Sequence, residues 1–294
     1  MYTWIDSFLL ACRARGLSSH TISDYSVTLK RFGARDLRAV TKTDIREFLA
    51  GLQVGNKTRL NYHTGLCAMF RWAVGEGLVD HNPMPEIPRP RPEKRVIQPI
   101  PFAHVRLMLA AINKSAIYRR SARGSMQRSL PGAQKNYLII LLLLDTGMRV
   151  TELCEICCKD VDIREQAIHI FGKGAKERIV PFSPKTAQAI LRYNKLDVPK
   201  ARLLTNSAGN PTDRFSVAKM IARLCRRAGV PAYTPHVFRH TFAIEYLRNG
   251  GDPFTLKKIL GHETMEMVNR YIELAQIDIM DAHRRASPVD NWKL

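Results

Sequence analysis

The stretch that decides the fold is TPHVFRHTFAIEYLRNGGDPFTLKKILGHETMEMVNRYIEL, residues 234–274. Thr234 and Pro235 are typical of a helix start, and apolar residues recur at helical spacing after them. Helices are predicted near 236–248, 253–260 and 264–274, with Gly261 ending the second of them. The free N–H groups at the start of the first helix make an anion site beside Arg239.

Several polar residues of this stretch are candidates for chemistry. His236 and Arg239 are one helical turn apart and are expected to face the same way, whereas His240 is expected to point elsewhere. His262 follows the Gly261 helix stop, and Tyr271 lies on the next helix among apolar residues. Taken singly, each has an ordinary structural explanation, and a tyrosine in such surroundings is most often part of the core.

The rest of the chain is predicted to be mainly helical. Helices are expected at 102–112, 137–144, 184–195 and 213–229, and four short ones fill the first 80 residues, where Thr43 is expected to cap the third. Between 161 and 182 the apolar period changes to two, which predicts a β-hairpin with Lys173 between two glycines at its tip. The predicted fold class is therefore mainly α with a small β-hairpin or sheet (α+β).

A proline-rich segment suggests a domain boundary. Seven of the 16 prolines fall between Pro83 and Pro101, and such a segment cannot hold a helix or an inner strand. We expect a helical domain at 1–82, a linker at 83–100 and a second domain at 101–294.

The charge of the chain points to an anionic partner. Its 294 residues carry a formal net charge of +20. Residues 1–88 carry +3, residues 89–95 another +3 and the remaining 199 residues +14. Nucleic acid is the first candidate and an anionic membrane surface the second.

The longest apolar run, 137–144, is too short to span a membrane, and Asp6 stands where a signal peptide has positive charge. With no zinc-ligand spacing around Cys154, Cys157 and Cys158, we expect reduced thiols and a cytoplasmic protein.

Two arginines, a lysine, two histidines and a tyrosine are the groups that metal-free phosphoryl transfer from DNA needs. Guanidinium groups hold the nonbridging oxygens of a phosphodiester, a hydroxyl attacks it, and an acid protonates the leaving 5′ oxygen. No acidic cluster beside these residues is suited to Mg²⁺, so we expect neither a metal nor a cofactor.

Four blocks in this order carry a family resemblance: TGMRVTEL, GKGAKERIVPF, HVFRHTFA and LGHETMEMVNRYIEL. They are similar to the signature blocks of the tyrosine recombinase, or phage integrase, family, most of all in its Xer-like and transposon-type members. The N-terminal helices resemble that family's SAM-like core-binding domain. The resemblance implies a core-binding domain followed by a catalytic domain and covers nearly the whole chain.

The resemblance implies a role for each candidate residue. Arg149 and Arg239 would clamp the scissile phosphate, Lys173 would protonate the leaving 5′ oxygen, with Lys176 as the alternative, and His236 would assist proton transfer at the nucleophile. His262 would donate a hydrogen bond to the phosphate and Tyr271 would be the nucleophile. Glu152, one turn after Arg149, would orient the site. The structural alternative for this spacing is an ordinary surface ion pair between the two side chains.

The resemblance also implies partners. These are double-stranded DNA and a homo-tetramer on two recombination sites, with a dimer on each site and a C-terminal tail that packs on a neighbouring protomer. Candidate contacts to the DNA backbone are Lys30, Lys57, Arg59, Arg119 and Arg120, the last two in a basic loop at 114–135.

Two alternatives share part of this pattern. A type IB topoisomerase has the same arginines, lysine, histidine and tyrosine, and a DNA-binding relative could hold DNA without cutting it. The helical domain ahead of the linker favours the recombinase over the first, and the complete residue set argues against the second. Neither the DNA target sequence nor the choice among integration, transposition, dimer resolution and inversion is visible in the sequence.

Overall fold

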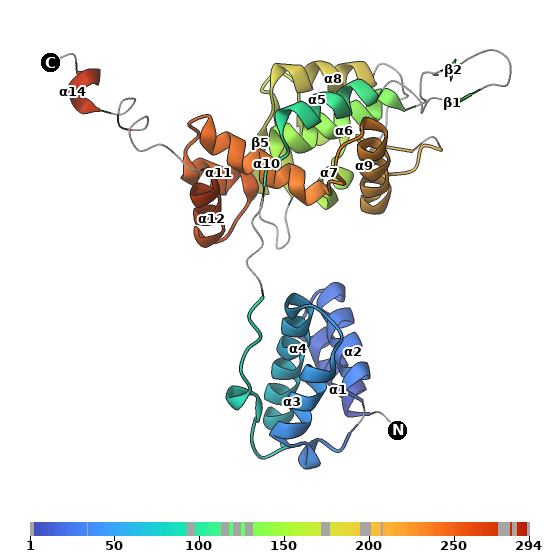
Figure 1. Ribbon diagram of the computed structural model, residues 1–294, viewed down its shortest axis with the longest axis vertical. Coiled ribbons are helices and arrows are strands. Elements are labelled where there is room, and N and C mark those ends of the chain that lie inside the picture. Colours follow the sequence, from blue (N-terminus) through green and yellow to red (C-terminus); the bar gives the residue numbers. More distant parts are fainter. Residues whose placement is uncertain are drawn as a thin grey trace. The chain divides into compact units, whose positions relative to one another are not determined.

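The computed structural model describes residues 3–33, 35–92, 98–112, 118–119, 125–126, 132–171, 177–194, 201–206, 208–275, 283 and 287–292. The chain divides into two compact units, Met1–Val96 (unit 1) and Ile97–Leu294 (unit 2), which are seen in Figure 1. Each unit has a hydrophobic core of its own. The predicted fold class, mainly helical with a small sheet, is confirmed.

Unit 1 is a helical module. Its elements are α1 (Trp4–Ala14), α2 (Ser19–Phe32), the 3-10 turn η1 (Leu37–Ala39), α3 (Lys42–Gly51), α4 (Asn56–Gly75) and the 3-10 turn η2 (Met84–Glu86). Helix α3 starts from Thr41 and not, as predicted, from Thr43. The Thr41 hydroxyl accepts from the N–H of Asp44, and the Asp44 carboxylate accepts from the N–H of Thr41. This reciprocal capping box makes Thr41 the N-cap, so the first residue of the helix is Lys42.

The described part of the proline-rich segment is only partly extended. Met84 and Ile87 are buried in the core of unit 1, and the Ile87 carbonyl lies 3.2 Å from Nε2 of His63. Ile100, near the other end, is buried in unit 2, and its N–H donates to the Thr241 hydroxyl at 2.9 Å. Both ends of this segment therefore belong to the packed units.

Unit 2 places a small sheet among helices (Figure 1). Its helices are α5 (Phe102–Ala111), α6 (Ala133–Thr146), α7 (Val150–Glu155), α8 (Pro184–Asn194), α9 (Arg214–Ala228), α10 (Pro235–Arg248), α11 (Pro253–Leu260), α12 (Glu266–Ala275) and α14 (Pro288–Asn291), with the 3-10 turn η3 (Cys158–Asp160).

The predicted hairpin is present and has a third strand. Strands β3 (Val161–Asp162), β4 (Ala167–Phe171) and β5 (Glu177–Pro181) form an antiparallel sheet in that order, with Ile168 opposite Val180. Within the predicted loop at 114–135, strands β1 (Tyr118–Arg119) and β2 (Ser125–Met126) pair antiparallel.

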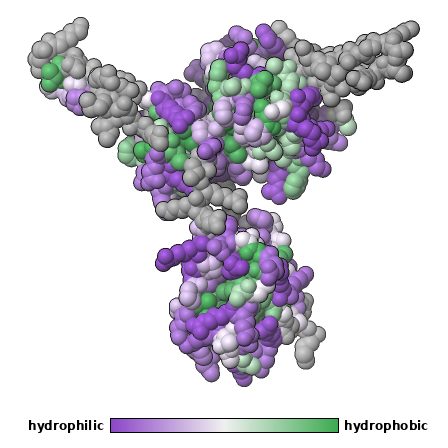
Figure 2. Space-filling view, viewed as in Figure 1, coloured by the Kyte–Doolittle hydropathy of each residue, from purple (hydrophilic) through white to green (hydrophobic). Residues whose placement is uncertain are grey.

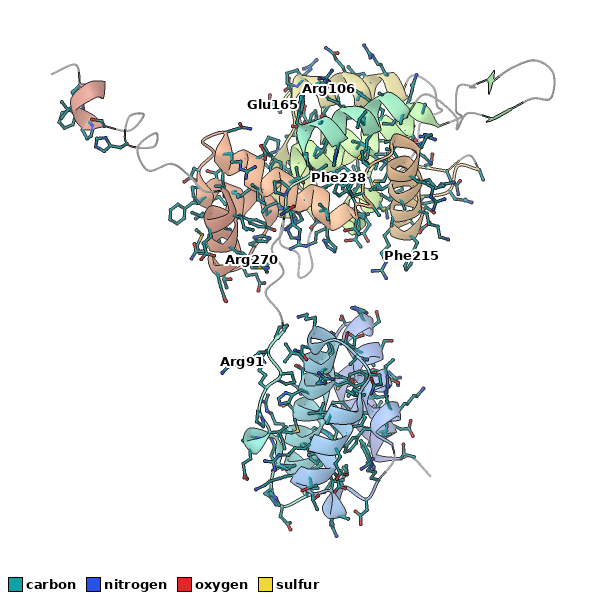
Figure 3. All side chains as sticks on the ribbon, in the orientation of Figure 1. Arg91, Arg106, Glu165, Phe215, Phe238 and Arg270 are labelled. Carbon is teal, nitrogen blue, oxygen red and sulfur yellow. The ribbon has the colours of Figure 1, made fainter. Side chains whose placement is uncertain are left out.

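Helices α6 and α10 carry the core of unit 2. The apolar run 138–143 of α6 is buried, and Phe238, near the start of α10, is fully buried in the same core (Figure 3). The other end of α10 packs with α11 and α12 in a smaller cluster that includes Leu247, Leu260 and Tyr271. Because α10 takes part in both clusters, it holds the Tyr271 helix against the rest of the unit.

The surface of unit 2 is mostly hydrophilic in the view of Figure 2, with hydrophobic patches where α5 lies. Phe102 and Leu107 of α5 are both exposed. Among the described residues, no helix combines the length and the apolar character needed to cross a bilayer. All six cysteines have free thiols.

Candidate active site

The turn between α6 and α7 places Arg149. Gly147 ends α6 with φ +60°, and a Cβ at that position would come within 2.2 Å of the Phe242 ring. This position therefore requires glycine. Arg149 follows as the residue just before α7, where its N–H donates to Glu152 Oε2 at 2.7 Å and its Nη1 donates to Oε1 at 2.9 Å. The Arg149 side chain is 40% exposed, so part of its guanidinium faces solvent.

Glu152 is held by a second arginine that the sequence analysis missed. Arg178, on β5, donates from Nη1 and Nη2 to the two Glu152 oxygens at 2.9 and 2.7 Å, and from Nε to the Ile259 carbonyl at 2.8 Å. The Glu152 side chain is 9% exposed, so this is a buried ion pair and not the surface pair that a three-residue spacing suggests. Burial raises the pKa of Glu152, but the hydrogen bonds from both arginines outweigh it and leave the pKa lowered.

Arg239, on α10, is buried and makes three hydrogen bonds within the protein. Nη1 donates to the Gly147 carbonyl at 2.8 Å, and Nη2 donates to the Leu260 carbonyl at 2.8 Å and to Nε2 of His262 at 2.9 Å. Burial, with the nearby charge of Arg149, lowers the pKa of Arg239 to about 10. A guanidinium has five N–H donors, so two have no partner among the described residues and are left for a ligand.

His262 is a neutral, buried imidazole. Since arginine can only donate, Nε2 of His262 is the acceptor of its bond to Arg239, and the ring proton is on Nδ1. That Nδ1 is buried and has no partner among the described residues. Burial and the charges of Arg239 and Arg149 lower the pKa of His262 to about 4. The ring therefore keeps one unused donor, which is what the predicted bond to a phosphate requires.

Tyr271 is buried beside these groups. It is 4% exposed, and its ring stacks on His262 with 6.2 Å between ring centroids and 15° between the planes. Its hydroxyl lies 2.7 Å from Nδ1 of His240. Burial raises the pKa of Tyr271, and the nearby arginines offset only part of that rise.

No role was predicted for His240. It was expected to point elsewhere than His236 and Arg239, and it faces α12, where it contacts the Tyr271 hydroxyl. One residue corresponds to a rotation of about 100° around a helix, and Tyr271 approaches from that side. His236, expected to assist the nucleophile, is exposed on the first turn of α10. His236 is four residues before His240 on the same helix, and its charge adds to burial in lowering the pKa of His240.

An open groove of about 1510 Å³ runs past this cluster. Arg149, Arg178 and His262 line it, together with Lys257 and Lys258 from α11. Four carboxylates line it as well, those of Glu152, Glu155, Glu177 and Glu263, so among the described residues they equal the four basic side chains in number. What the groove offers to an anion is therefore the local group of Arg149, Arg178 and the His262 imidazole.

The remaining predicted residues are of two kinds. Lys173 and Lys176 lie outside the described residues, as do Arg120 and the side chain of Arg119. Lys30 and Lys57 are exposed on unit 1 and stay predicted DNA contacts. Arg59 instead donates to the carbonyls of Leu49 and Leu52 at 2.9 and 3.0 Å and to the Asn56 side chain, so the fold already uses its guanidinium.

Comparison with known proteins decides the family. Residues 114–277, more than half of the chain, match the phage integrase family. The chain belongs to the phage integrase family. This match and the relatives described next confirm the predicted family and enzyme class, a tyrosine-type site-specific DNA recombinase.

Relatives of this integrase extend over nearly its whole length. Tyrosine recombinase XerD of Listeria monocytogenes is 28% identical over 295 residues, which cover 93% of this chain and 94% of the relative. Tyrosine recombinase XerC of Pelobacter propionicus is 28% identical over 291 residues, 93% of this chain and 91% of the relative.

Solved structures share the fold. The Tn1549 transposon integrase in complex with a circular intermediate DNA aligns over all of both chains with a TM-score of 0.73 and 21% identity. The XerH site-specific recombinase bound to a palindromic difH substrate aligns over 96% of this chain and 82% of its own, with a TM-score of 0.71 and 19% identity.

No group of three or more His, Cys, Asp or Glu side chains suited to a metal ion occurs within the described part of this integrase. Cys154 lies in α7 and Cys158 in η3, both only partly buried. Burial raises the pKa of the Cys154 thiol to about 11, so it is protonated at neutral pH.

Glu152→Gln is expected to lower the free energy of unfolding by about 2 kcal/mol, because it leaves two guanidiniums without their counter-charge. The loss depends on pH. Since the folded pKa of Glu152 is below its ordinary value of 4.5, the carboxylate stabilises the fold above that pH and stops doing so as the pH falls through the folded value. Denaturant unfolding at several pH values measures the difference.

A matched control for this variant is Glu245→Gln. Glu245 pairs with Arg248 on α10, and both side chains are at least 40% exposed. An exposed pair contributes at most about 1 kcal/mol. If both variants lose the same stability, or if the loss in Glu152→Gln persists at low pH, the buried pair does not have the role assigned to it.

Proposed function

We propose that Arg149 and Arg239 bind the scissile phosphate of double-stranded DNA and that Tyr271 attacks it, which gives a 3′-phosphotyrosyl intermediate and a free 5′ hydroxyl. The observation that carries this proposal is the meeting of Arg149, Arg239, His262 and Tyr271, which come from three separate places in the chain. Arg239 binds His262 and the carbonyl of Gly147, two residues before Arg149, and the Tyr271 ring stacks on His262.

The charge of this site favours a phosphodiester. Arg149, Arg178 and Arg239 bring three positive charges, Glu152 compensates one of them, and His262 is neutral at pH 7. The remaining excess of two belongs to this cluster and not to the groove as a whole, whose four described basic side chains are matched by four carboxylates. At the cluster, a phosphate and the negative charge that develops on it during attack are stabilised. Each guanidinium binds two nonbridging oxygens in a fixed geometry, which an ammonium does not.

The other groups of the proposed reaction have separate tasks. His262 donates its free Nδ1–H to the phosphate, and Glu152, fixed by Arg178, orients Arg149. Lys173 protonates the leaving 5′ oxygen, with Lys176 as the alternative, and His236 assists proton transfer from its exposed position at the start of α10. Tyr271 is 4% exposed, and its hydroxyl contacts His240.

At the level of the whole chain, we propose a core-binding domain at 1–82, a linker at 83–100 and a catalytic domain at 101–294. Four protomers act on two recombination sites in the cytoplasm, two on each site, and the tail after Tyr271 packs on a neighbour. The relatives named tyrosine recombinase support this reading over a type IB topoisomerase, since they match more than nine-tenths of the chain. A binding-only relative has no need of a buried tyrosine beside a phosphate site.

The test is covalent capture. The protein is incubated with sheared genomic DNA of its host, free protein is removed in SDS, and the bound fragments are sequenced to find the site. A nicked duplex with that site then traps the intermediate, and peptide mapping locates the attached residue. We expect one DNA-linked peptide, the one that contains Tyr271, and the same yield in EDTA. Attachment at another residue would contradict the proposal.

A further inference from the structure

His240 is the histidine in direct contact with the nucleophile. Its Nδ1 lies 2.7 Å from the Tyr271 hydroxyl, and the two rings are 5.7 Å apart at 48°. The contact joins α10 to α12 across 31 residues of sequence. His236, the histidine expected to assist this tyrosine, is exposed on the first turn of α10.

The state of the His240 ring fits a proton acceptor. It is partly buried, and burial together with the charges of His236, Arg239 and Arg270 lowers its pKa to about 4, so the ring is neutral at pH 7. A neutral imidazole with its proton on Nε2 has a free lone pair on Nδ1. The phenol is the donor that this lone pair meets.

Arginines and imidazoles surround His240. Arg239 and His236 belong to its own helix, Arg270 lies on α12 next to Tyr271 (Figure 3), and the neutral His262 lies on the turn between α11 and α12. A phosphodiester bound in the groove would place a negative charge near the His240 imidazole. Negative charge favours the protonated imidazole and thereby makes His240 a stronger base when DNA is bound.

The position of Tyr271 relates His240 to the phosphate site. The Tyr271 ring stacks on His262, whose Nε2 is held by Arg239, while the Tyr271 hydroxyl contacts His240. Arg239 and His240 are adjacent on α10, so one helix turn carries both the phosphate ligand and the acceptor at the phenol. The 2.7 Å between the Tyr271 hydroxyl and Nδ1 of His240 is within reach of direct proton transfer.

We infer that His240 is a further catalytic residue, the general base that takes the phenolic proton of Tyr271 during strand cleavage. As the O–H bond of Tyr271 breaks, the proton moves to Nδ1 of His240, the phenolic oxygen bonds to phosphorus, and the bond from phosphorus to the 5′ oxygen breaks. The leaving oxygen takes a proton from a separate acid. In religation the His240 imidazolium returns the proton to the phenolate. The inference rests on the proposed role of Tyr271.

The decisive variant is His240→Asn. The amide oxygen of asparagine lies near the place of Nδ1 and accepts a hydrogen bond from the phenol, but it cannot take up a proton. Single-turnover formation of the covalent adduct is measured with the nicked DNA between pH 5 and 9. We expect a fall of about 100-fold at pH 7, within the usual contribution of a general base.

The shape of the pH profile is a second readout. The wild-type rate should fall at low pH, as protonation of His240 in the DNA complex removes the lone pair, and His240→Asn should lack this acidic limb. In His240→Ala, added imidazole should restore at least one tenth of the lost rate, because it fits the space of the missing ring.

A matched control is His104→Asn. His104 contacts the hydroxyl of Tyr233 through Nδ1 at 2.6 Å, so it has the same type of contact on α5 of the same unit. This control should keep the wild-type rate and profile, and thermal unfolding identifies any variant that fails to fold.

Three results would overturn the inference: a His240→Asn rate within about threefold of wild type, an unchanged acidic limb, or a faster rate. The last would mean that His240 restrains Tyr271 instead of activating it. The proposed role of Tyr271 fails separately, by adduct formation in Tyr271→Phe, so failure of one proposal is distinguishable from failure of the other.

Discussion

Tyr271→Phe is expected to abolish the covalent DNA adduct, with a loss of at least about 10⁴-fold in the single-turnover cleavage rate. The variant lacks only the oxygen that forms the bond to phosphorus. The phenylalanine ring still fits the cluster of α10, α11 and α12 and still stacks on His262, so the fold should lose only the hydrogen bond to His240, about 1 kcal/mol. Gel analysis of adducts on nicked DNA measures the loss.

The control for this variant is Tyr246→Phe. Tyr246 packs against the same cluster from α10 and has no proposed part in the reaction. It should form the adduct at the wild-type rate, and noncovalent DNA binding should be the same in all three proteins. An adduct that persists in Tyr271→Phe would assign the nucleophile to another residue, whereas loss of DNA binding would show that the ring also positions the substrate.

The sequence predicts well those parts of the site that depend on local spacing. Arg149 and Glu152 are three residues apart at a helix start, and this spacing alone places the carboxylate within reach of the arginine. Likewise, Thr234 and Pro235 identify the start of α10, as the structure confirms. In each case one helix or turn contains all the interacting atoms.

Contacts between distant elements could not be predicted in the same way. Arg178 meets Glu152 across 26 residues, and its alternation within the hairpin says only which face it occupies. Arg178 is indicated only indirectly: a buried Glu152 carboxylate beside one half-exposed arginine needs a second cationic partner. The contact of His240 could not be predicted because its partner lies on α12, and the packing of α12 on α10 depends on apolar residues from three helices.

The burial of Arg239 could not be predicted for a related reason. Periodicity shows which helix face is apolar, but α10 has buried residues around most of its circumference, and Arg239 is one of them because its carbonyl partners compensate the loss of water. Gly147 and Leu260 supply those carbonyls from the ends of α6 and α11, where helix carbonyls have no partner of their own. Arg239 thus caps two helices, a structural role that the sequence did not predict.

Arg239→Lys is therefore expected to reduce both cleavage and stability. A lysine brings the same charge on one nitrogen with three donors, and it cannot reach two carbonyls, His262 and a phosphate at once. We expect the cleavage rate to fall by about 10³-fold, the lower end of the contribution of a transition-state arginine. The free energy of unfolding should fall by about 2 kcal/mol, since buried carbonyls lose their partners.

Rate and stability can be separated. Arg248→Lys on the exposed face of α10 is the matched control and should change neither quantity measurably. Below its unfolding transition, Arg239→Lys should still bind DNA, with the affinity and its salt dependence reduced by no more than one phosphate contact. A cleavage rate within tenfold of wild type would show that Arg239 serves the fold alone. A large rate loss with DNA binding nearly intact would instead mean that the planar guanidinium acts in the transition state, because the charge itself is conserved in the variant.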